Sequence, residues 1–225
     1  MPRDDAVSFL LKRTGQKGEG AAAALAEELG FLPLALEQAG AYMEATGRAL
    51  SHYLTLFREQ KLKLLERGVP AGDYKFTVAT TWEVSFEKIH GKAPADLMNL
   101  CSFLAPDDIP LDIIREGVEH LPGRLARAAK APLDFNDVVA TLRRYSLAEV
   151  GEDSISVHRL VQAVARDRLT QNDRKKWVEA AAQVVNKAFP GGSDDVRTWP
   201  QCSRLLAHAL AAAGHAEELH VAPEP

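Results

Sequence analysis

The sequence contains few cysteines and no long apolar run. Cys101 and Cys202 are the only cysteines among 225 residues, and they lie far apart within apolar helical patterns. A disulfide framework or a zinc cluster requires more thiols or histidines at close spacing, so we expect reduced, buried thiols and no metal site. Because no apolar stretch could span a bilayer and no basic-then-apolar leader follows Met1, we expect a cytoplasmic protein without a membrane anchor.

An excess of charge of either sign is also missing. The chain carries 27 lysines and arginines against 31 aspartates and glutamates, a net charge of -4. This balance gives no general attraction to nucleic acids or anionic lipids. Neither cysteine has a histidine and an acid at the spacing of a nucleophilic site, so the sequence predicts no catalytic residue and no enzyme activity.

Glycine and proline divide the first part of the chain into helical segments. The apolar spacing predicts helices over 4–13, 20–29, 33–46 and 51–66, with Gly15, Gly30 and Gly47 as stops. Pro33 lies where a helix can begin, because proline has no N–H and its φ is already helical. Residues 1–72 are therefore predicted to form a compact helical bundle.

Further along, the apolar period changes from helical to alternating. Residues 146–150 and 154–158 alternate around Gly151, which predicts a short β-hairpin. We predict helices over 77–89, 94–104, 110–117 and 138–145 before this hairpin, with 121–132 as a surface loop or short helix, and a helix over 159–169 after it. This order is that of a winged helix over residues 73–170.

Residues 171–225 are predicted to form C-terminal helices, over 173–189 and 201–213. The predicted fold is mainly α, with a helical bundle, a winged-helix domain with one short β-hairpin, and these helices. Trp82, Trp177 and Trp199 are expected to be core aromatics. Pro33 and His158 each have a local explanation: Pro33 as a helix start, and His158 as a histidine satisfied by a backbone carbonyl between hairpin and helix.

Two sequence blocks resemble the NB-ARC group of STAND nucleotide-switch proteins. L-G-F-L-P-L-A-L-E-Q-A-G-A-Y at 29–42 resembles the GLPLAL helix of that group, and I-S-V-H-R-L-V-Q-A-V-A-R at 155–166 resembles its MHD-type motif. Between them, T-T-W-E-V-S-F at 80–86 is similar to the opening of the winged-helix lobe. W-P-Q-C-S-R-L-L-A-H-A-L at 199–210 is similar to the segment that leads into tetratricopeptide repeats in bacterial and fungal members.

The resemblance implies a regulatory lid that reads the ADP or ATP state of a nucleotide held by an upstream P-loop domain. It implies that Pro33 packs against the adenine and that His158 reaches the terminal phosphate of ADP. An imidazole N–H can donate to a diphosphate oxygen, which lets such a lid respond to nucleotide exchange. The implied partners are the P-loop domain, downstream repeats and, on activation, further copies of the protein.

This sequence also departs from the family pattern. It contains no G-x-x-x-x-G-K-[ST] motif and no acidic strand end for magnesium. We therefore expect the segment to be a fragment of a longer ATPase that neither hydrolyses ATP nor binds nucleotide alone. Val157 and Arg159 replace the methionine and aspartate that flank the family histidine.

A winged helix also suggests a DNA-binding transcriptional regulator as the alternative function. Arg143 and Arg144 are the paired bases on the helix that would enter the major groove. Residues 76–170 carry 11 lysines and arginines against 14 aspartates and glutamates, and the wing carries Glu149, Glu152 and Asp153. These acids would repel phosphates, so nucleic acid is not the expected partner.

Overall fold

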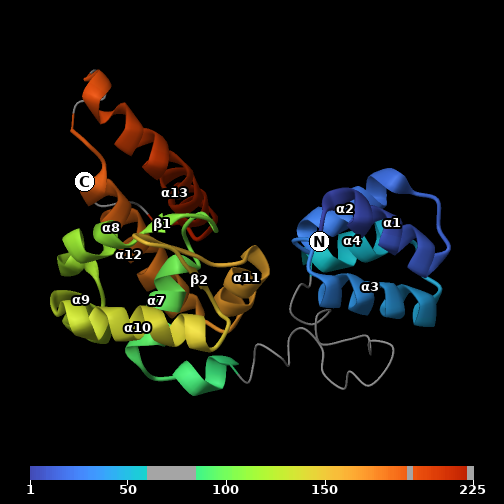
Figure 1. Cartoon of the computed structure of the whole chain (residues 1–225), viewed down its shortest axis with the longest axis horizontal. Coiled ribbons are helices and arrows are strands. Elements are labelled where there is room, and N and C mark those ends of the chain that lie inside the picture. Colours follow the sequence, from blue (N-terminus) through green and yellow to red (C-terminus); the bar gives the residue numbers. More distant parts are fainter. Residues whose placement is uncertain (60–84, 192–194, 222–225) are drawn as a thin grey trace. The chain divides into compact units, whose positions relative to one another are not determined.

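The computed structural model describes residues 1–59, 85–191 and 195–221. The chain divides into two compact units, Met1–Val84 and Ser85–Pro225 (Figure 1). Most of the helix predicted over 77–89, together with Trp82 and the end of the one predicted over 51–66, lies outside the described residues. The three-part division at 1–72, 73–170 and 171–225 stays a prediction.

The first unit is a bundle of four helices within residues 1–59. The helices are α1 (Arg3–Thr14), α2 (Glu19–Glu28), α3 (Pro33–Thr46) and α4 (Leu50–Glu59). Helix α1 packs against α2 and α3, while α4 packs mainly against α2. Fully buried side chains from all four helices form the core, among them Leu10, Leu25, Leu36, Tyr53 and Phe57.

Local signals in the sequence set the ends of these helices. Gly15 and Gly47 cap α1 and α3 in the left-handed conformation, with φ of 67° and 64°. Residues with a Cβ rarely adopt this conformation, which explains why glycine ends both helices. Pro33 is the first residue of α3, as predicted.

The second unit is mainly helical with a small sheet at its centre (Figure 1). Residues 85–89 are helical and precede the named elements. The helices are α7 (Ala93–Cys101), α8 (Leu111–Glu116), α9 (Gly123–Lys130), α10 (Pro132–Arg144), α11 (Arg159–Asp167), α12 (Gln171–Ala188) and α13 (Trp199–Glu218), with 3-10 turns η1 (Val118–His120) and η2 (Val196–Thr198).

The sheet has three strands, whereas the sequence predicted one hairpin. Strands β2 (Glu149–Val150) and β3 (Ser154–Ser156) form that hairpin, and β1 (Ile109–Pro110) pairs antiparallel with β3. The strand order is β1-β3-β2. Ile109 lies opposite Ile155, and both are fully buried. The prediction missed β1 because two residues that end in a proline carry no alternating pattern.

Several helix boundaries differ from the prediction. Residues 121–132 were predicted to form either a surface loop or a short helix, and residues 123–130 form α9. Helix α10 begins at Pro132 rather than at 138, because a proline fits the first helical position. Helix α13 begins at Trp199, which is 57% exposed and not a core aromatic. Trp177 is buried, as predicted.

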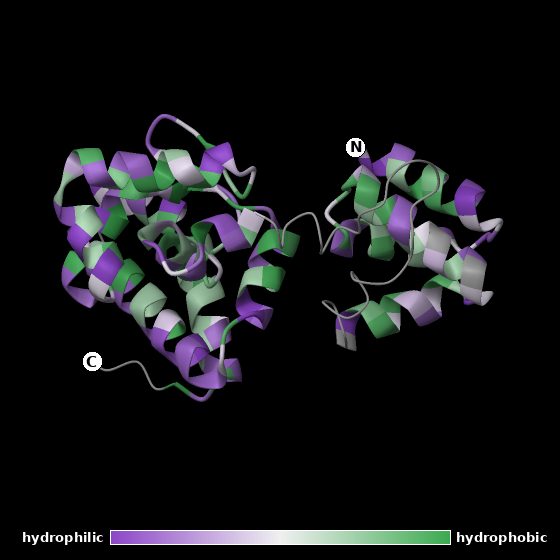
Figure 2. Cartoon of the chain, turned by 90° about the horizontal axis from the view of Figure 1, so that it is seen from below, coloured by the Kyte–Doolittle hydropathy of each residue, from purple (hydrophilic) through white to green (hydrophobic). Residues whose placement is uncertain are grey.

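Amphipathic packing organises the second unit. Helix α12 contacts α7, α8 and α13, so the C-terminal helices belong to the same unit as the sheet. Hydrophobic and hydrophilic faces alternate around the helices of both units (Figure 2). The described helices include none that combines the length and apolarity needed to cross a membrane.

Candidate functional site

His158 lies at the junction between the sheet and α11. It is the N-cap residue of α11, and its Nδ1 accepts a hydrogen bond from the Leu160 backbone N–H at 3.2 Å. When Nδ1 is an acceptor, a neutral imidazole carries its proton on Nε2. The cap therefore selects the tautomer in which half-buried His158 has a donor N–H at Nε2.

The neighbours of His158 hold this junction in place. Val157 is fully buried, and its N–H donates to the Pro106 carbonyl at 2.7 Å. Arg159 begins α11 and is exposed. Val157 is thus a core residue and Arg159 a surface residue.

Two polar side chains of α11 hold it to the C-terminal end of α7. Gln162 is 3% exposed, and its Nε2 donates to the carbonyls of Cys101 at 2.8 Å and Leu104 at 3.1 Å. Arg166 donates to the Ser102 carbonyl. The last carbonyls of a helix lack partners within the helix. Without Gln162 the buried Leu104 carbonyl would have no partner among the described residues, whereas the Cys101 carbonyl would keep the Leu104 N–H.

Pro33 lies at an exposed turn in the first unit. The backbone is left-handed at both Gly30 and Phe31, with φ of 61° and 56°, and it becomes extended at Leu32 before α3 begins. A left-handed Phe31 costs about 1–2 kcal/mol, since its Cβ crowds the following carbonyl. Of the other residues in the L-P-L-A-L block, Ala35 and Leu36 are buried in the core, whereas Leu32 and Leu34 are half-buried.

Pro33 and His158 belong to different units. The two-residue nucleotide site predicted from the resemblance therefore stays a prediction. Pro33 is the first residue of a helix, as the sequence suggested. His158 accepts from the Leu160 N–H, a backbone donor where the sequence suggested a backbone carbonyl, because the ring caps the start of α11.

Helix α13 is tied to the tip of the sheet. Arg204 forms ion pairs with Asp108 at 3.5 Å and with Asp153 in the β2–β3 turn at 3.1 Å. Buried His208 lies within hydrogen-bond distance of the Asp108 carbonyl, at 3.3 Å. These contacts connect the C-terminal helix directly to the hairpin that precedes His158.

The described residues contain no group of three or more histidine, cysteine or acidic side chains placed to hold a metal ion. Cys101 and Cys202 are free thiols; Cys101 is buried and Cys202 is partly exposed. Burial raises the pKa of the Cys101 thiol to about 12, which keeps it protonated.

Comparison with known proteins yields two findings. The model of a family described as a domain of unknown function, DUF7779, matches residues 84–174, which span α7 to the start of α12. The chain is also 27% identical over 229 residues to a nucleotide-binding leucine-rich repeat (NLR)-like protein of Hyaloscypha variabilis. That similarity covers 93% of this chain and 22% of the relative, so the chain spans about a fifth of that protein. It supports at most a relationship to the NLR or NB-ARC type.

Proposed function

We propose that the chain is the regulatory lid segment of an NB-ARC-type nucleotide switch and that it is not itself an enzyme. The observation that carries this proposal is the 27% identity to a protein named as nucleotide-binding and NLR-like, in an alignment that covers 93% of the chain. The winged-helix interpretation of the second unit is supported by the order of its elements, in which β1, the helices α8, α9 and α10 and the β2–β3 hairpin follow one another, and by β3 lying between β1 and β2.

In this proposal His158 senses the nucleotide through Nε2. Its Nδ1 is held by the Leu160 N–H, so the neutral ring presents Nε2–H as the donor suited to a diphosphate oxygen. Gln162, one turn further along α11, fixes the helix that carries the ring. Pro33, exposed at the start of α3, supplies an apolar surface for the adenine.

ADP would be held by Pro33 and His158 together with a P-loop domain outside this segment. The lid closes while His158 donates to the diphosphate, and nucleotide exchange removes this bias toward the closed state. Because Arg204 and His208 fasten α13 to the sheet, motion of the lid would carry α13 with it.

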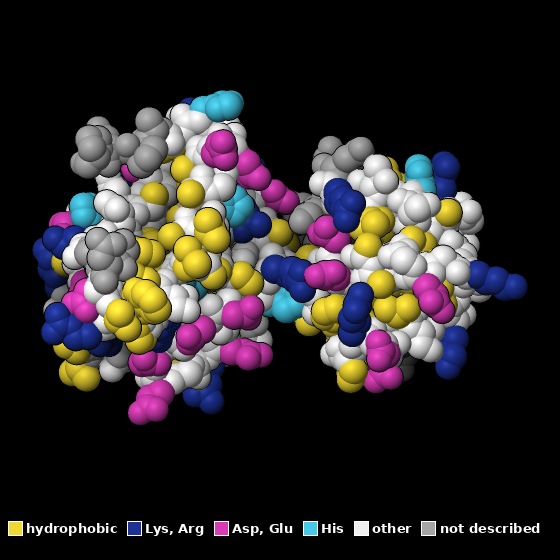
Figure 3. All heavy atoms as spheres, turned by 90° about the horizontal axis from the view of Figure 1, so that it is seen from above, with side chains coloured by type: hydrophobic (Ala, Val, Ile, Leu, Met, Phe, Trp, Pro, Cys, Tyr) yellow, Lys and Arg dark blue, Asp and Glu magenta, His cyan; other side chains and the backbone are white. Residues whose placement is uncertain are grey.

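The surface of α13 suits the proposed coupling to downstream repeats. Trp199, Leu206 and Leu210 are 57%, 52% and 65% exposed and follow the helical period, so they share one face. Apolar side chains also gather on the face of the second unit that Figure 3 shows. Exposed apolar patches of this kind are typical of interaction surfaces, here toward following repeats or another copy.

The decisive test separates the two roles of His158 in the complete gene product that contains this segment. Asparagine is a good N-cap residue, so His158→Asn keeps α11 capped but removes the imidazole, whereas His158→Ala removes both. We expect both variants to lose bound ADP, measured by chromatography of the denatured protein. Only His158→Ala should also lose about 1 kcal/mol of stability.

Retention of ADP by His158→Asn would show that the histidine serves only as a cap. Pro33→Ala, made in parallel, is expected to weaken ADP binding through the adenine contact. Sequencing the region upstream of residue 1 is the simplest check, because the proposal requires a P-loop there.

The DNA-binding alternative gains no support from the structure. Glu152 and Asp153 at the tip of the hairpin are exposed, where they would face a DNA backbone. Arg143 and Arg144 at the end of α10 are exposed, but the acidic hairpin lies beside the same helix in sequence and in contact.

A further inference from the structure

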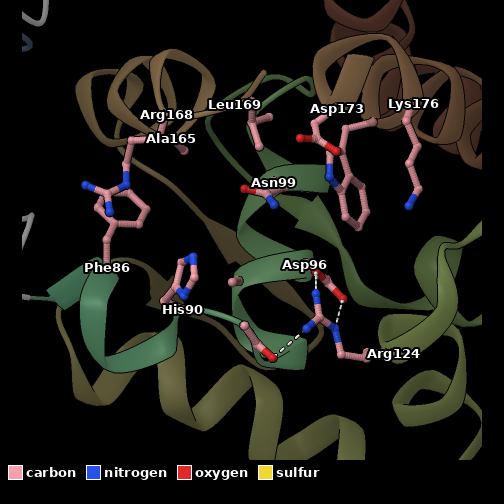
Figure 4. A pocket seen from close by; sticks show the side chains of 13 residues that line it. Phe86, His90, Asp96, Asn99, Arg124, Ala165, Arg168, Leu169, Asp173 and Lys176 are labelled. Carbon is pink, nitrogen blue, oxygen red and sulfur yellow. Dashed lines mark hydrogen bonds and ion pairs between the residues drawn. The ribbon is translucent and has the colours of Figure 1, made fainter. Parts of the chain in front are cut away.

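A cavity of about 600 Å³ lies in the second unit, where α7 and α9 face the α11–α12 junction (Figure 4). It is at the opposite end of α11 from His158, about 15 Å away along the helix axis at 1.5 Å per residue. Its volume falls within the range of small-molecule sites. The proposed nucleotide switch makes no use of this cavity.

Two buried aromatic rings line this cavity, and each has a cation beside it. Phe86 is 6% exposed and Trp177 is 4% exposed. The Arg168 guanidinium lies 5.2 Å from the centre of the Phe86 ring, and the Lys176 ammonium lies 5.9 Å from that of Trp177. The cavity therefore combines apolar walls with positive charge.

Of the two acids that line the cavity, Asp96 is paired with an arginine, whereas within the described residues Asp173 is hydrogen-bonded only to a neutral hydroxyl. The Asp96 side chain is 8% exposed and accepts two hydrogen bonds from Arg124, both at 3.1 Å (Figure 4). Asp173 accepts a hydrogen bond from the Thr170 hydroxyl at 2.7 Å, in the cap of α12. A bidentate arginine neutralises a carboxylate effectively, so Asp96 contributes little negative potential.

The remaining polar groups favour an anion. Within residues 1–59, 85–191 and 195–221, Lys176 and His90 form no ion pair and the Asn99 amide forms no hydrogen bond. All three line the cavity (Figure 4). Together they offer an ammonium, an imidazole and an amide, with the Arg168 guanidinium beside them. Among the charged side chains that line the cavity, Arg124, Arg168 and Lys176 stand against Asp96 and Asp173, which leaves one positive charge in excess.

We propose that this cavity binds a small organic anion. Its planar apolar body packs against Trp177, and its phosphate or carboxylate group is held by Lys176, whose ammonium lies beside that ring. Asn99 and His90, which lie apart from Lys176 in Figure 4, supply hydrogen-bonding groups at the opposite end of the ligand. A ligand there touches α7, α9 and α12 at once, so it stabilises the packing of the C-terminal helices on the rest of the unit. The proposal does not depend on nucleotide sensing.

The test uses the 225-residue chain labelled with nitrogen-15 and titrated with phenyl phosphate as the probe. The indole N–H signal of Trp177 should shift in a saturable manner, while that of exposed Trp199 on α13 stays in place. Inorganic phosphate and phenol, which each carry half of the probe, should bind more weakly than phenyl phosphate. Benzoate carries a carboxylate in place of the phosphate, so its affinity relative to that of phenyl phosphate tells which of the two anionic groups the cavity prefers.

Two lysines on the same turn of α12 provide matched variants. Lys175 and Lys176 are both exposed, and of the two only Lys176 lines the cavity. Lys176→Gln should weaken phenyl phosphate binding about tenfold, the effect of losing one charged hydrogen bond. Lys175→Gln, with the same change of charge, should leave it unchanged.

Three results would overturn the proposal. The first is the absence of a saturable Trp177 shift with either anion at millimolar concentration. The second is equal weakening by the two lysine variants, which would indicate a general charge effect. The third is binding of phenol as tight as that of phenyl phosphate. Because the assay contains no ADP, its failure would leave the lid proposal intact, and loss of the lid proposal would leave this one intact.

Discussion

Replacing Gln162 with methionine should destabilise the second unit by about 2–3 kcal/mol. The Gln162 amide donates to two buried carbonyls, and methionine keeps a similar volume without a donor. The Cys101 carbonyl also accepts from the Leu104 N–H at 3.2 Å, so it keeps one partner. The Leu104 carbonyl accepts from no other described residue and would lose its partner entirely.

An orphaned buried acceptor costs about 1–3 kcal/mol, and the weakened Cys101 carbonyl adds a smaller amount. Urea unfolding followed by tryptophan fluorescence measures the loss, because Trp177 is buried in the same unit. Gln171→Met, at the exposed first residue of α12, is the control and should change stability by less than about 0.5 kcal/mol. A loss below about 1 kcal/mol in Gln162→Met would refute the role of Gln162 in anchoring α11.

Three further outcomes follow from burial. Burial lowers the pKa of His208 below 6.5, so the folded chain keeps it neutral where the unfolded chain protonates it. Acidification below pH 6.5 should therefore lower stability, by up to about 1.4 kcal/mol per pH unit from His208 alone. Burial also lowers the pKa of His215, so His208→Gln should reduce the slope in urea titrations without abolishing it, and an unchanged slope would contradict the assignment. A Cβ at Gly117 would lie 2.9 Å from a valine methyl on α12, so Gly117→Ala should lower the free energy of unfolding by about 1–3 kcal/mol, measured by thermal unfolding. Gly20→Ala is the control, because a Cβ at Gly20 enters open space and should cause no loss of stability. Ellman's reagent should react with the partly exposed Cys202 in the folded chain and with the buried Cys101 only after denaturation. Reaction of both thiols in the folded chain would show that α7 opens readily.

The sequence indicated part of the candidate site and missed the rest for physical reasons. His158 was singled out by the resemblance of residues 155–166 to the MHD-type motif, and the structure gives it the cap that fixes its tautomer. Gln162 was not identified from the sequence, although a polar residue among the apolar positions of α11 is a signal that could have been used. Its partners lie about 60 residues earlier in the chain, at separations that no local pattern encodes.

The cavity is the clearest case of a feature hidden from the sequence. Phe86, Asp96, Arg124 and Lys176 come from segments that are separated along the chain, and only packing brings them to one space. Lys176 by itself is an ordinary exposed lysine, and Asp96 an ordinary acid near a helix start. Their significance rests on which neighbours each one has.

The sequence by itself determined α1 and α3 with their boundaries at Gly15, Pro33 and Gly47, and the β2–β3 hairpin, because these depend on backbone preferences within a few residues. Tertiary structure alone decided that Ile109–Pro110 joins the hairpin as a third strand, that Gln162 closes the end of α7, and that α13 is fastened to the sheet. Those contacts join residues dozens of positions apart. They form only when burial of the common core makes up for the entropy lost in bringing them together.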